Sequence, residues 1–324
     1  MTKRKAICCI DGDLLVFKAS ASNEERSIKA LHKPSGREKV FKHRTALKEF
    51  LEGKDFPLSD FEITDVQDAG PISHALQIAK QIINNILKAC GTDRYEIYLS
   101  GEDNFRDALP LPTKYKGNRD GMLKPLQIAD VRDYLIGRHK AIIVNGREAD
   151  DQISIRQWDG VKSGQKIIGC STDKDSMGTE GWVFNWDKMK EPVLIKGLGD
   201  LYLDDKGKVR GHGNKWKYLQ WIVGDSIDGL NPTHLAGLKY GEKSAFNLLS
   251  NLQTEKECWK SIHDLYLSWY PDKIEYTDQN GNNVVADYLD IAQVYWDAVH
   301  MLRWEGDKVD IRNVMVKLGV LHEK

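Results

Sequence analysis

Long apolar runs, paired histidines and a strong net charge are all absent from this sequence of 324 residues. No apolar run approaches the roughly 20 residues of a membrane span, and no small-residue cleavage site follows the start, so we expect neither a membrane protein nor a signal peptide. The nine histidines form no pair at helical ligand spacing, which argues against a zinc site. The net charge of −1 does not decide whether nucleic acid is a partner, because acids gathered at one metal site would mask basic patches elsewhere.

Cysteine is scarce and irregularly spaced. An odd number of cysteines without the spacing of a metal motif favours neither a disulfide framework nor a zinc site. Three of them lie in or beside apolar strand-like runs, so we expect buried thiols in a reducing, cytoplasmic environment. The five are Cys8, Cys9, Cys90, Cys170 and Cys258.

Apolar strand-like runs alternate with helical patterns over the first part of the chain. This alternation predicts an α/β fold with a central, mainly parallel sheet and helices on both faces. Proline and the 3.6-residue spacing of apolar side chains mark the helix starts. The expected strands are Ala6–Ile10, Tyr95–Leu99, Ala141–Val144 and Lys166–Cys170, and the expected helices begin at Pro71 and at about Asp150.

Two stretches depart from this alternation, and the character of the chain then changes. Residues 20–70, which include a hairpin over Ile28–Phe41, are expected to form an insertion. Residues 104–125 are polar, basic and proline-containing, which indicates a lid or mobile connection. From Trp216 onward the pattern is mainly helical. We therefore predict an α/β core over residues 1–215 and a helical part over residues 216–324.

Acidic residues follow each expected strand and also lie between the two parts of the chain. Helix capping explains any one of them, because Asp is favoured at N-caps and in turns. In an open α/β sheet, however, these positions share one rim, where so many like charges repel unless cations hold them. Oxygen ligands favour magnesium or manganese, and two such ions about 4 Å apart can promote phosphodiester hydrolysis. Asp13 is expected to support the site rather than bind an ion. The acids are Asp11, Glu102, Asp103, Glu148, Asp150, Asp151, Asp173, Asp175, Asp225 and Asp228.

A basic stretch follows the second expected strand. Lys116 and Arg119 are three residues apart, so a helix would present both on one face, where they could grip a phosphate and stabilise charge in a transition state. The alternative is a solvated basic loop, but the position directly after an acidic strand end favours phosphate binding. The stretch surrounds Tyr115 with Arg106, Lys114, Lys116, Arg119 and Lys124.

A glycine-punctuated turn that carries a lysine follows Asp225 and Asp228 and opens a new helix. Glycine lets backbone amides approach a phosphate, and a helix N-terminus adds positive potential. The glycine spacing does not fit a P-loop, and Glu242 intrudes before the lysine. A clamp that holds a DNA backbone without reading bases fits better. Together with the acids, it predicts an enzyme that holds a nucleic-acid strand and cuts it. The expected clamp residues are Gly237, Gly241, Lys243 and Ser244.

In this order the motifs resemble those of the flap endonuclease/5′-3′ exonuclease family of PIN-like nucleases, particularly the 5′-3′ exonucleases of short-tailed bacteriophages. The resemblance covers residues 6–17 and about 95–250. The matching motifs are Asp11-Gly12-Asp13, Asn104-Phe105-Arg106 running to Tyr115-Lys116-Gly117-Asn118-Arg119, Glu148-Ala149-Asp150-Asp151, Ser171-Thr172-Asp173-Lys174-Asp175, and Gly224-Asp225-Ser226-Ile227-Asp228 with its glycine turn.

The resemblance implies a nuclease with two Mg²⁺ ions, replaceable by Mn²⁺, that removes nucleotides from DNA 5′ ends or flaps, and from RNA in hybrids as a further substrate. It implies a role in phage DNA replication, in the host cytoplasm and beside replication proteins. A helical arch would cover the site, and a helix–three-turn–helix clamp at about 221–250 would hold the duplex, with K⁺ as an optional ion. Arg106, Lys116 and Arg119 would contact the strand or the scissile phosphate. The implied metal ligands and their supports are Asp11, Asp103 (preferred to Glu102 for its distance from Arg106), Glu148, Asp150, Asp151, Asp173, Asp175, Asp225 and Asp228.

Two other functions compete with this interpretation. A phosphatase of the haloacid-dehalogenase type would use Asp11 as a covalent nucleophile and Asp13 as the acid/base. That scheme leaves the acids at 148–151 and the basic stretch without a role. A non-catalytic DNA-binding relative would retain the fold, but every acid expected of an active enzyme is present.

Overall fold

The computed structural model describes residues 5–322, which divide into two compact units. Within that range, no helix is both long and apolar enough to cross a membrane. The predicted core and the predicted helical part both contribute to the first unit, and the whole of the predicted insertion lies in the second. The first unit comprises the chain up to Asp13, Asn85–Met122 and the chain from Ala141; the second comprises Leu14–Asn84 and Leu123–Lys140.

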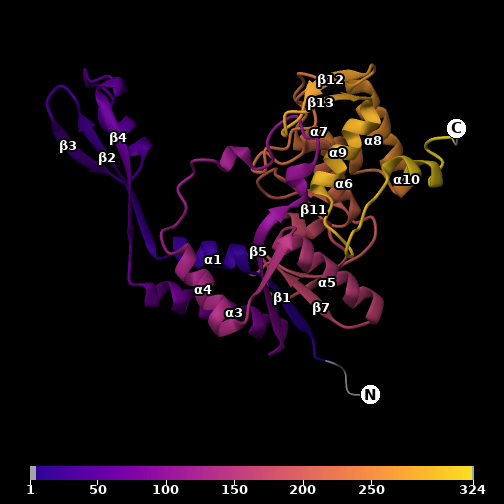
Figure 1. The fold of residues 1–324 in the computed structure, drawn as a ribbon, viewed down its shortest axis with the longest axis horizontal. Coiled ribbons are helices and arrows are strands. Elements are labelled where there is room, and N and C mark those ends of the chain that lie inside the picture. The colour runs from indigo at the N-terminus through magenta and orange to yellow at the C-terminus, as the bar shows by residue number, and fades with distance from the viewer. Residues whose placement is uncertain (1–4, 323–324) are drawn as a thin grey trace. The chain divides into compact units, whose positions relative to one another are not determined.

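The first unit contains a six-stranded sheet in the order β6-β5-β1-β7-β8-β9. Figure 1 labels β1, β5 and β7 of this sheet. All neighbouring strands are parallel except β8 and β9, so the prediction of a mainly parallel sheet is confirmed. Strand β1 lies between β5 and β7, where the direction of the chain order reverses. Open α/β sheets bind ligands beside such a reversal, outside the carboxyl ends of the strands. The strands are β1 (Ile7–Asp11), β5 (Tyr95–Asn104), β6 (Ile142–Gly146), β7 (Ile167–Cys170), β8 (Gly181–Phe184) and β9 (Val193–Ile195).

Helix α5 (Ala149–Ser163) packs on one face of this sheet, where Ile153 joins Cys9 in a buried apolar cluster. Every residue of β1 is buried, as expected for a central parallel strand. Alternate side chains of β1 face the other side of the sheet. There the last turn of α3 (Ile72–Cys90) brings Cys90 against the strands. The helix predicted from Pro71 is therefore confirmed, with its end fixed on the sheet.

The C-terminal part of the first unit is built around aromatic side chains. Trp221 is fully buried, packs against Trp259 and Trp296, and donates a hydrogen bond from its indole nitrogen to the Ala292 carbonyl at 2.7 Å. This packing fixes the end of α6, from which the acidic turn at 225–228 begins. The part is mainly helical. Its elements are α6 (Asn214–Val223), α7 (Glu242–Leu249), α8 (Glu255–Trp269), α9 (Tyr288–Val299), α10 (Ile311–Lys317), and the hairpins of β10 (Leu201–Leu203) with β11 (Val209–Gly211) and β12 (Ile274–Thr277) with β13 (Asn283–Ala286).

In the second unit, the predicted insertion forms a three-stranded antiparallel sheet in the order β3-β2-β4. The predicted hairpin is confirmed, with Ile28 opposite Phe41. Leu47 of the following helix is completely buried in a small apolar cluster with Ile28 and Phe41, which fixes that helix on the sheet. The elements of this region are α1 (Gly12–Ala21), β2 (Glu24–His32), β3 (Arg37–Phe41), α2 (Arg44–Leu51), η1 (Leu58–Asp60), β4 (Phe61–Ala69) and α4 (Ile128–His139).

The helical arch implied by the resemblance is not found in residues 104–125. These residues form two short 3₁₀ turns, η2 (Phe105–Ala108) and η3 (Gly117–Arg119), and no α-helix. Prolines at 110 and 112 remove backbone donors, and Lys116 adopts a left-handed φ of 55° that a right-handed helix cannot include.

Candidate functional site

Acidic side chains from separate segments of the first unit line two small neighbouring pockets. One pocket is lined by residues after β7, the other by residues from the turn after α6, and both include Asp150 and Asp175. The helix dipole at the start of α5 also favours negative charge at Asp150. The structure thus brings together six of the ten acids that the sheet-edge argument grouped. The carboxylates that line the pockets are Glu148, Asp150, Asp173, Asp175, Asp225 and Asp228.

Several of these carboxylates are held in surroundings that oppose their charge. Burial raises the pKa of Asp150, and the charges of Asp151 and Glu148 raise it further. Burial likewise raises the pKa of Asp175, with Asp173 adding to the effect. Burial is also the main cause of the raised pKa of Asp228. An all-oxygen donor set in which like charges oppose one another fits a hard divalent cation, whose charge would reverse this repulsion.

Lysine and arginine side chains lie among the acids. Lys116 forms an ion pair with Glu148, and Arg119 forms one with Asp228. Lys174, which sequence reasoning did not single out, lies 3.2 Å from Asp225. Within residues 5–322, no three carboxylates bring oxygens within 4.8 Å of one another. A cation bound here would therefore compete with these basic groups for the carboxylates.

Asp11 lies at the end of β1, only 5% exposed, and lines neither pocket. Its carboxylate accepts a hydrogen bond of 2.9 Å from the Ser171 hydroxyl, and its charge contributes to the raised pKa of Asp150. Asp13 accepts a hydrogen bond of 3.0 Å from the backbone amide of Ser100. Asp11 therefore belongs to the buried base of the acid cluster, and Asp13 joins the start of α1 to β5.

Arg106 and Asp151 were expected at the phosphate and at the metal, and the structure corrects both expectations. They form a buried, two-point ion pair with distances of 2.6 and 3.1 Å, and their exposed fractions are 2% and 0%. The guanidinium also donates to the carbonyls of Ala298 and His300, so its donors are used inside the protein. Burying either charge without the other is strongly unfavourable, so this pair stabilises the wall of the second pocket, which Arg106 lines and Asp151 does not.

Asp103 was also expected to bind metal, and the structure places it outside both acidic pockets. It lies in an irregularity between β5 and β6, where the pairing shifts between Ser100 and Asn104, and its φ is 62°. Its side chain is exposed and lines neither pocket, and neither does that of Glu102. A bulge re-aims the side chains of the bulged strand, and neither Asp103 nor Glu102 joins the carboxylates of the pockets.

Tyr115 is a central side chain whose role the sequence did not reveal. It is buried, and its hydroxyl lies 3.2 Å from Glu148 and 3.4 Å from Asp228. Burial raises its pKa, so the hydroxyl keeps its proton as a donor. The Lys116 amide donates to the Asp228 carbonyl at 2.8 Å, which fixes the basic stretch on the acidic turn.

Two amides also hold site carboxylates. Asn104 donates to Glu148 at 2.9 Å, and Gln220 of α6 donates to Asp175. Lys174 lies between two acids in the Ser171–Asp175 motif, which could have marked it as a site residue. Nothing in the sequence around Gln220 distinguishes it from an ordinary helix residue.

The predicted clamp residues follow the acidic turn on an exposed surface. Gly237 has a positive φ of 65°, and an added side chain there would meet nothing within 4 Å. Gly241 is the N-cap of α7, and Lys243 and Ser244 are exposed in its first turn. The stretch between α6 and α7 thus presents glycines, a lysine and the N-terminus of α7 close together in sequence. This arrangement suits binding of a phosphate.

No family model and no curated protein matches this sequence. The structure is similar to that of the T5 D15 protein co-crystallised with metal ions, with 14% identity, a TM-score of 0.47, and coverage of 97% of this chain and 92% of that chain. It is also similar to the bacteriophage T5 D15 flap endonuclease in a complex with DNA and metal ions, with 13% identity, a TM-score of 0.47 and the same coverage. A zinc-bound T5 5′-exonuclease gives 15% identity, a TM-score of 0.45, and coverage of 98% and 90%. At these values the likeness assigns no activity to this chain.

Proposed function

We propose that this chain is a divalent-metal-dependent nuclease that hydrolyses DNA phosphodiester bonds at 5′ ends or flaps. The observation that carries this proposal is the meeting of six carboxylates from three separate segments in two adjoining pockets, with basic side chains among them. Acids alone would suit a storage or structural cation site. Acids interleaved with phosphate-binding cations suit a reaction on a phosphodiester.

Each group has a defined task in this scheme. The carboxylates of the two pockets would hold Mg²⁺, with Mn²⁺ as a substitute. When bound, such ions lower the pKa of water and offset charge on a phosphodiester. Lys116 and Arg119 would bind the phosphate, and Tyr115 would keep Glu148 and Asp228 in position through its hydroxyl. Ser171 would hold Asp11 in a fixed orientation.

The exposed turn before α7 supplies the second half of the proposal. Gly237, Gly241, Lys243 and Ser244 would hold the duplex backbone, with K⁺ as an optional ion at the glycine turn. Contacts of this kind position a duplex without reading its sequence. The order of the motifs along the chain supports DNA 5′ ends or flaps as the substrate, RNA in hybrids as a further one, and a role in phage DNA replication in the host cytoplasm.

The phosphatase alternative is disfavoured by the surroundings of Asp11. A covalent nucleophile must reach its substrate, but Asp11 is 5% exposed and bound to Ser171. A non-catalytic relative would have no need for carboxylates whose pKa values are raised by burial and by one another. Both alternatives are outcomes of the experiment below.

The test is digestion of a 5′-labelled duplex, a 3′-labelled duplex and a 5′-flap substrate, each with and without Mg²⁺. We expect Mg²⁺-dependent release of short products from the 5′ label. In Asp173→Asn, the loss of one carboxylate ligand should reduce the rate by about 10³-fold, equivalent to about 4 kcal/mol of transition-state stabilisation.

Asp103→Asn is the matched control, because it removes the same charge outside the pockets and Asn tolerates a positive φ. It should cleave at the wild-type rate. Absence of cleavage with Mg²⁺ would contradict the proposed function. Trapping of a phosphorylated Asp11 during turnover of a phosphate monoester would support the phosphatase instead.

A further inference from the structure

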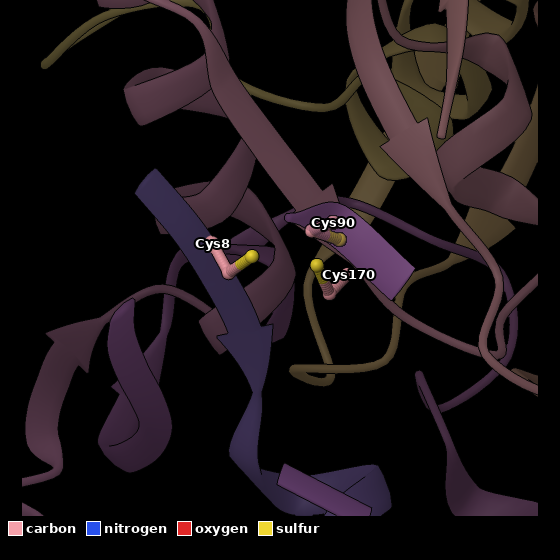
Figure 2. Close-up of side chains that lie close together, drawn as sticks. All are labelled: Cys8, Cys90 and Cys170. Atoms are coloured by element: carbon pink, nitrogen blue, oxygen red, sulfur yellow. The ribbon is translucent and has the colours of Figure 1, made fainter. Parts of the chain in front are cut away.

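Three of the five cysteines gather in one buried cluster, although their positions in the sequence suggested no site. The Sγ atoms of Cys8, Cys90 and Cys170 all lie within 4.8 Å of one another, and Figure 2 shows the three side chains close together. All three are buried free thiols. The expectation that the cysteines are buried is confirmed, but the inference from spacing that they form no metal-type group is not.

The fold itself explains why these residues meet. Cys8 lies on β1 and Cys170 on the adjacent parallel strand β7, where Cys170 pairs with Ile10. Because side chains alternate along a strand, Cys8 and Cys170 face the same side of the sheet, two positions apart. The last residue of α3, Cys90, completes the triangle on that side. Cys9 faces the other way, into the cluster under α5.

The sulfurs already interact as a group. Hydrogen bonds from Cys170 and Cys8 lower the pKa of Cys90, whereas burial raises the pKa of Cys170. The positive charge of Lys166 also acts on Cys90 and Cys8. Thiolate rather than thiol is the form that binds a metal, so the lowered pKa of Cys90 favours binding of a cation by these sulfurs.

The chemistry of the donor atoms determines which cation the cluster prefers. Sulfur ligands select soft cations, and the hard Mg²⁺ expected at the carboxylate rim prefers oxygen. Among residues 5–322, no Asp, Glu or His joins this cluster as a fourth ligand, so the trio differs from the four-ligand set typical of structural zinc sites. Binding of M²⁺ by three thiolates releases the protons that the sulfurs still hold and leaves one net negative charge, which Lys166 would partly offset.

We propose that Cys8, Cys90 and Cys170 bind one soft, thiophilic metal cation through three sulfur atoms. The cation would join β1 and β7 to the end of α3. This inference is independent of the nuclease activity, because the cluster contains none of the side chains of the carboxylate pockets.

Cadmium is the direct probe, because its bonds to thiolate absorb in the ultraviolet and its bonds to carboxylate do not. Metal-free, reduced protein in excess Mg²⁺ is titrated anaerobically with Cd²⁺. We expect thiolate absorption that saturates at one Cd²⁺ per chain and an upward shift in the melting temperature. Cys90→Ser, at the helix end, should lose most of that absorption, and Cys258→Ser, a buried thiol outside the cluster, should keep it.

Alkylation of the wild-type protein tests the same site without any variant. With Cd²⁺ bound, the modification rates of Cys8, Cys90 and Cys170, followed by peptide mass spectrometry, should fall at least tenfold. Those of Cys9 and Cys258 should not change. Absence of saturable absorption, or equal protection of all five thiols, would show that the three cysteines only fill space in the interior.

Discussion

Asp150 and Asp151 are adjacent in the first turn of α5, yet their carboxylates lie in opposite environments. Asp151 is completely buried and paired with Arg106, whereas Asp150 lines both acidic pockets and has its pKa raised by burial and by neighbouring acids. The charge of Asp151 is neutralised within the protein by Arg106. The charge of Asp150 is left to be neutralised by a bound cation. Adjacent acids can thus divide between the stability of the fold and the chemistry of the site.

The same division recurs in the C-terminal part. Asp307 is buried, and it accepts hydrogen bonds from His300 at 3.0 Å and from Arg303 at 2.8 Å. These partners lower its pKa, although burial opposes the effect. Burial instead raises the pKa of Asp228, although the charges of Lys116 and Arg119 oppose the effect. Asp307 and Asp228 thus differ in the direction of their pKa shifts, because the partners of Asp307 outweigh its burial and those of Asp228 do not. Asp151 and Asp307 form the paired group of acids, and Asp150 and Asp228 belong to the group that lines the pockets.

The distinction between paired acids and pocket acids would fail most clearly if Asp150 proved to be structural. Asp150→Asn keeps the oxygen that accepts the Asp151 amide at 2.7 Å but removes the charge. We expect Mg²⁺-dependent cleavage to fall by about 10³-fold, which is several kcal/mol of lost electrostatic stabilisation. The free energy of unfolding, measured in urea with EDTA, should stay the same or rise, because the charge is opposed by burial. A large loss of stability with normal cleavage would place Asp150 in the other group.

Asp151→Asn should give the opposite result. Breaking one partner of a buried ion pair typically costs about 3–5 kcal/mol of stability, because the other charge is left uncompensated. Urea unfolding of Asp151→Asn, of Arg106→Met and of the double variant measures this loss. The double variant should be destabilised by less than the sum of the single variants, since the second substitution removes the stranded charge. Additive losses would mean that the two side chains do not stabilise each other.

Much of the fold could be predicted because strands and helices of the first unit follow periodic apolar patterns. The strand expected at Ala6–Ile10 lies at Ile7–Asp11, and the helix expected from Pro71 is α3. Strand β4 could not be predicted, since most of its residues are exposed or half-buried and its sequence lacks a clear alternation. The left-handed conformation of Lys116 also has no sequence signal, so the turn structure of the basic stretch was missed.

The acids of the site could be predicted as a group but not one by one. Strand ends predict which carboxylates lie at the rim, because parallel strands share an edge. The pairing of Arg106 with Asp151 joins residues far apart in sequence and depends on α5 and the end of α9. The bulge that isolates Asp103 depends on how β5 pairs with β6. Such contacts are set by tertiary packing, which no local motif records.

The pH dependence of stability tests the role of His300, the buried partner of Asp307. Burial is the main reason that the pKa of His300 falls to about 4, below the ordinary value of 6.5, so the unfolded chain takes up the proton first. Stability should therefore fall as the pH drops from about 6.5 to 4, by on the order of 3 kcal/mol from this group. His300→Phe, which retains a ring to stack on Trp296, should flatten that part of the curve. Parallel curves for the two proteins would rule out this role for His300.

The smallest expected effect comes from Lys243→Ala, a substitution outside both the paired acids and the pocket acids. Lys243 is exposed at the start of α7, away from both the paired acids and the pockets. Lys243→Ala should leave stability and the cleavage rate at saturating DNA unchanged. Loss of one phosphate contact should weaken DNA binding and reduce the slope of log K against log salt by about 0.9. Lys206→Ala, an exposed lysine in the turn between β10 and β11, is the control and should not change that slope. An unchanged slope for Lys243→Ala, measured by fluorescence anisotropy in EDTA, would remove the turn before α7 from the DNA interface and leave the acids without their proposed clamp.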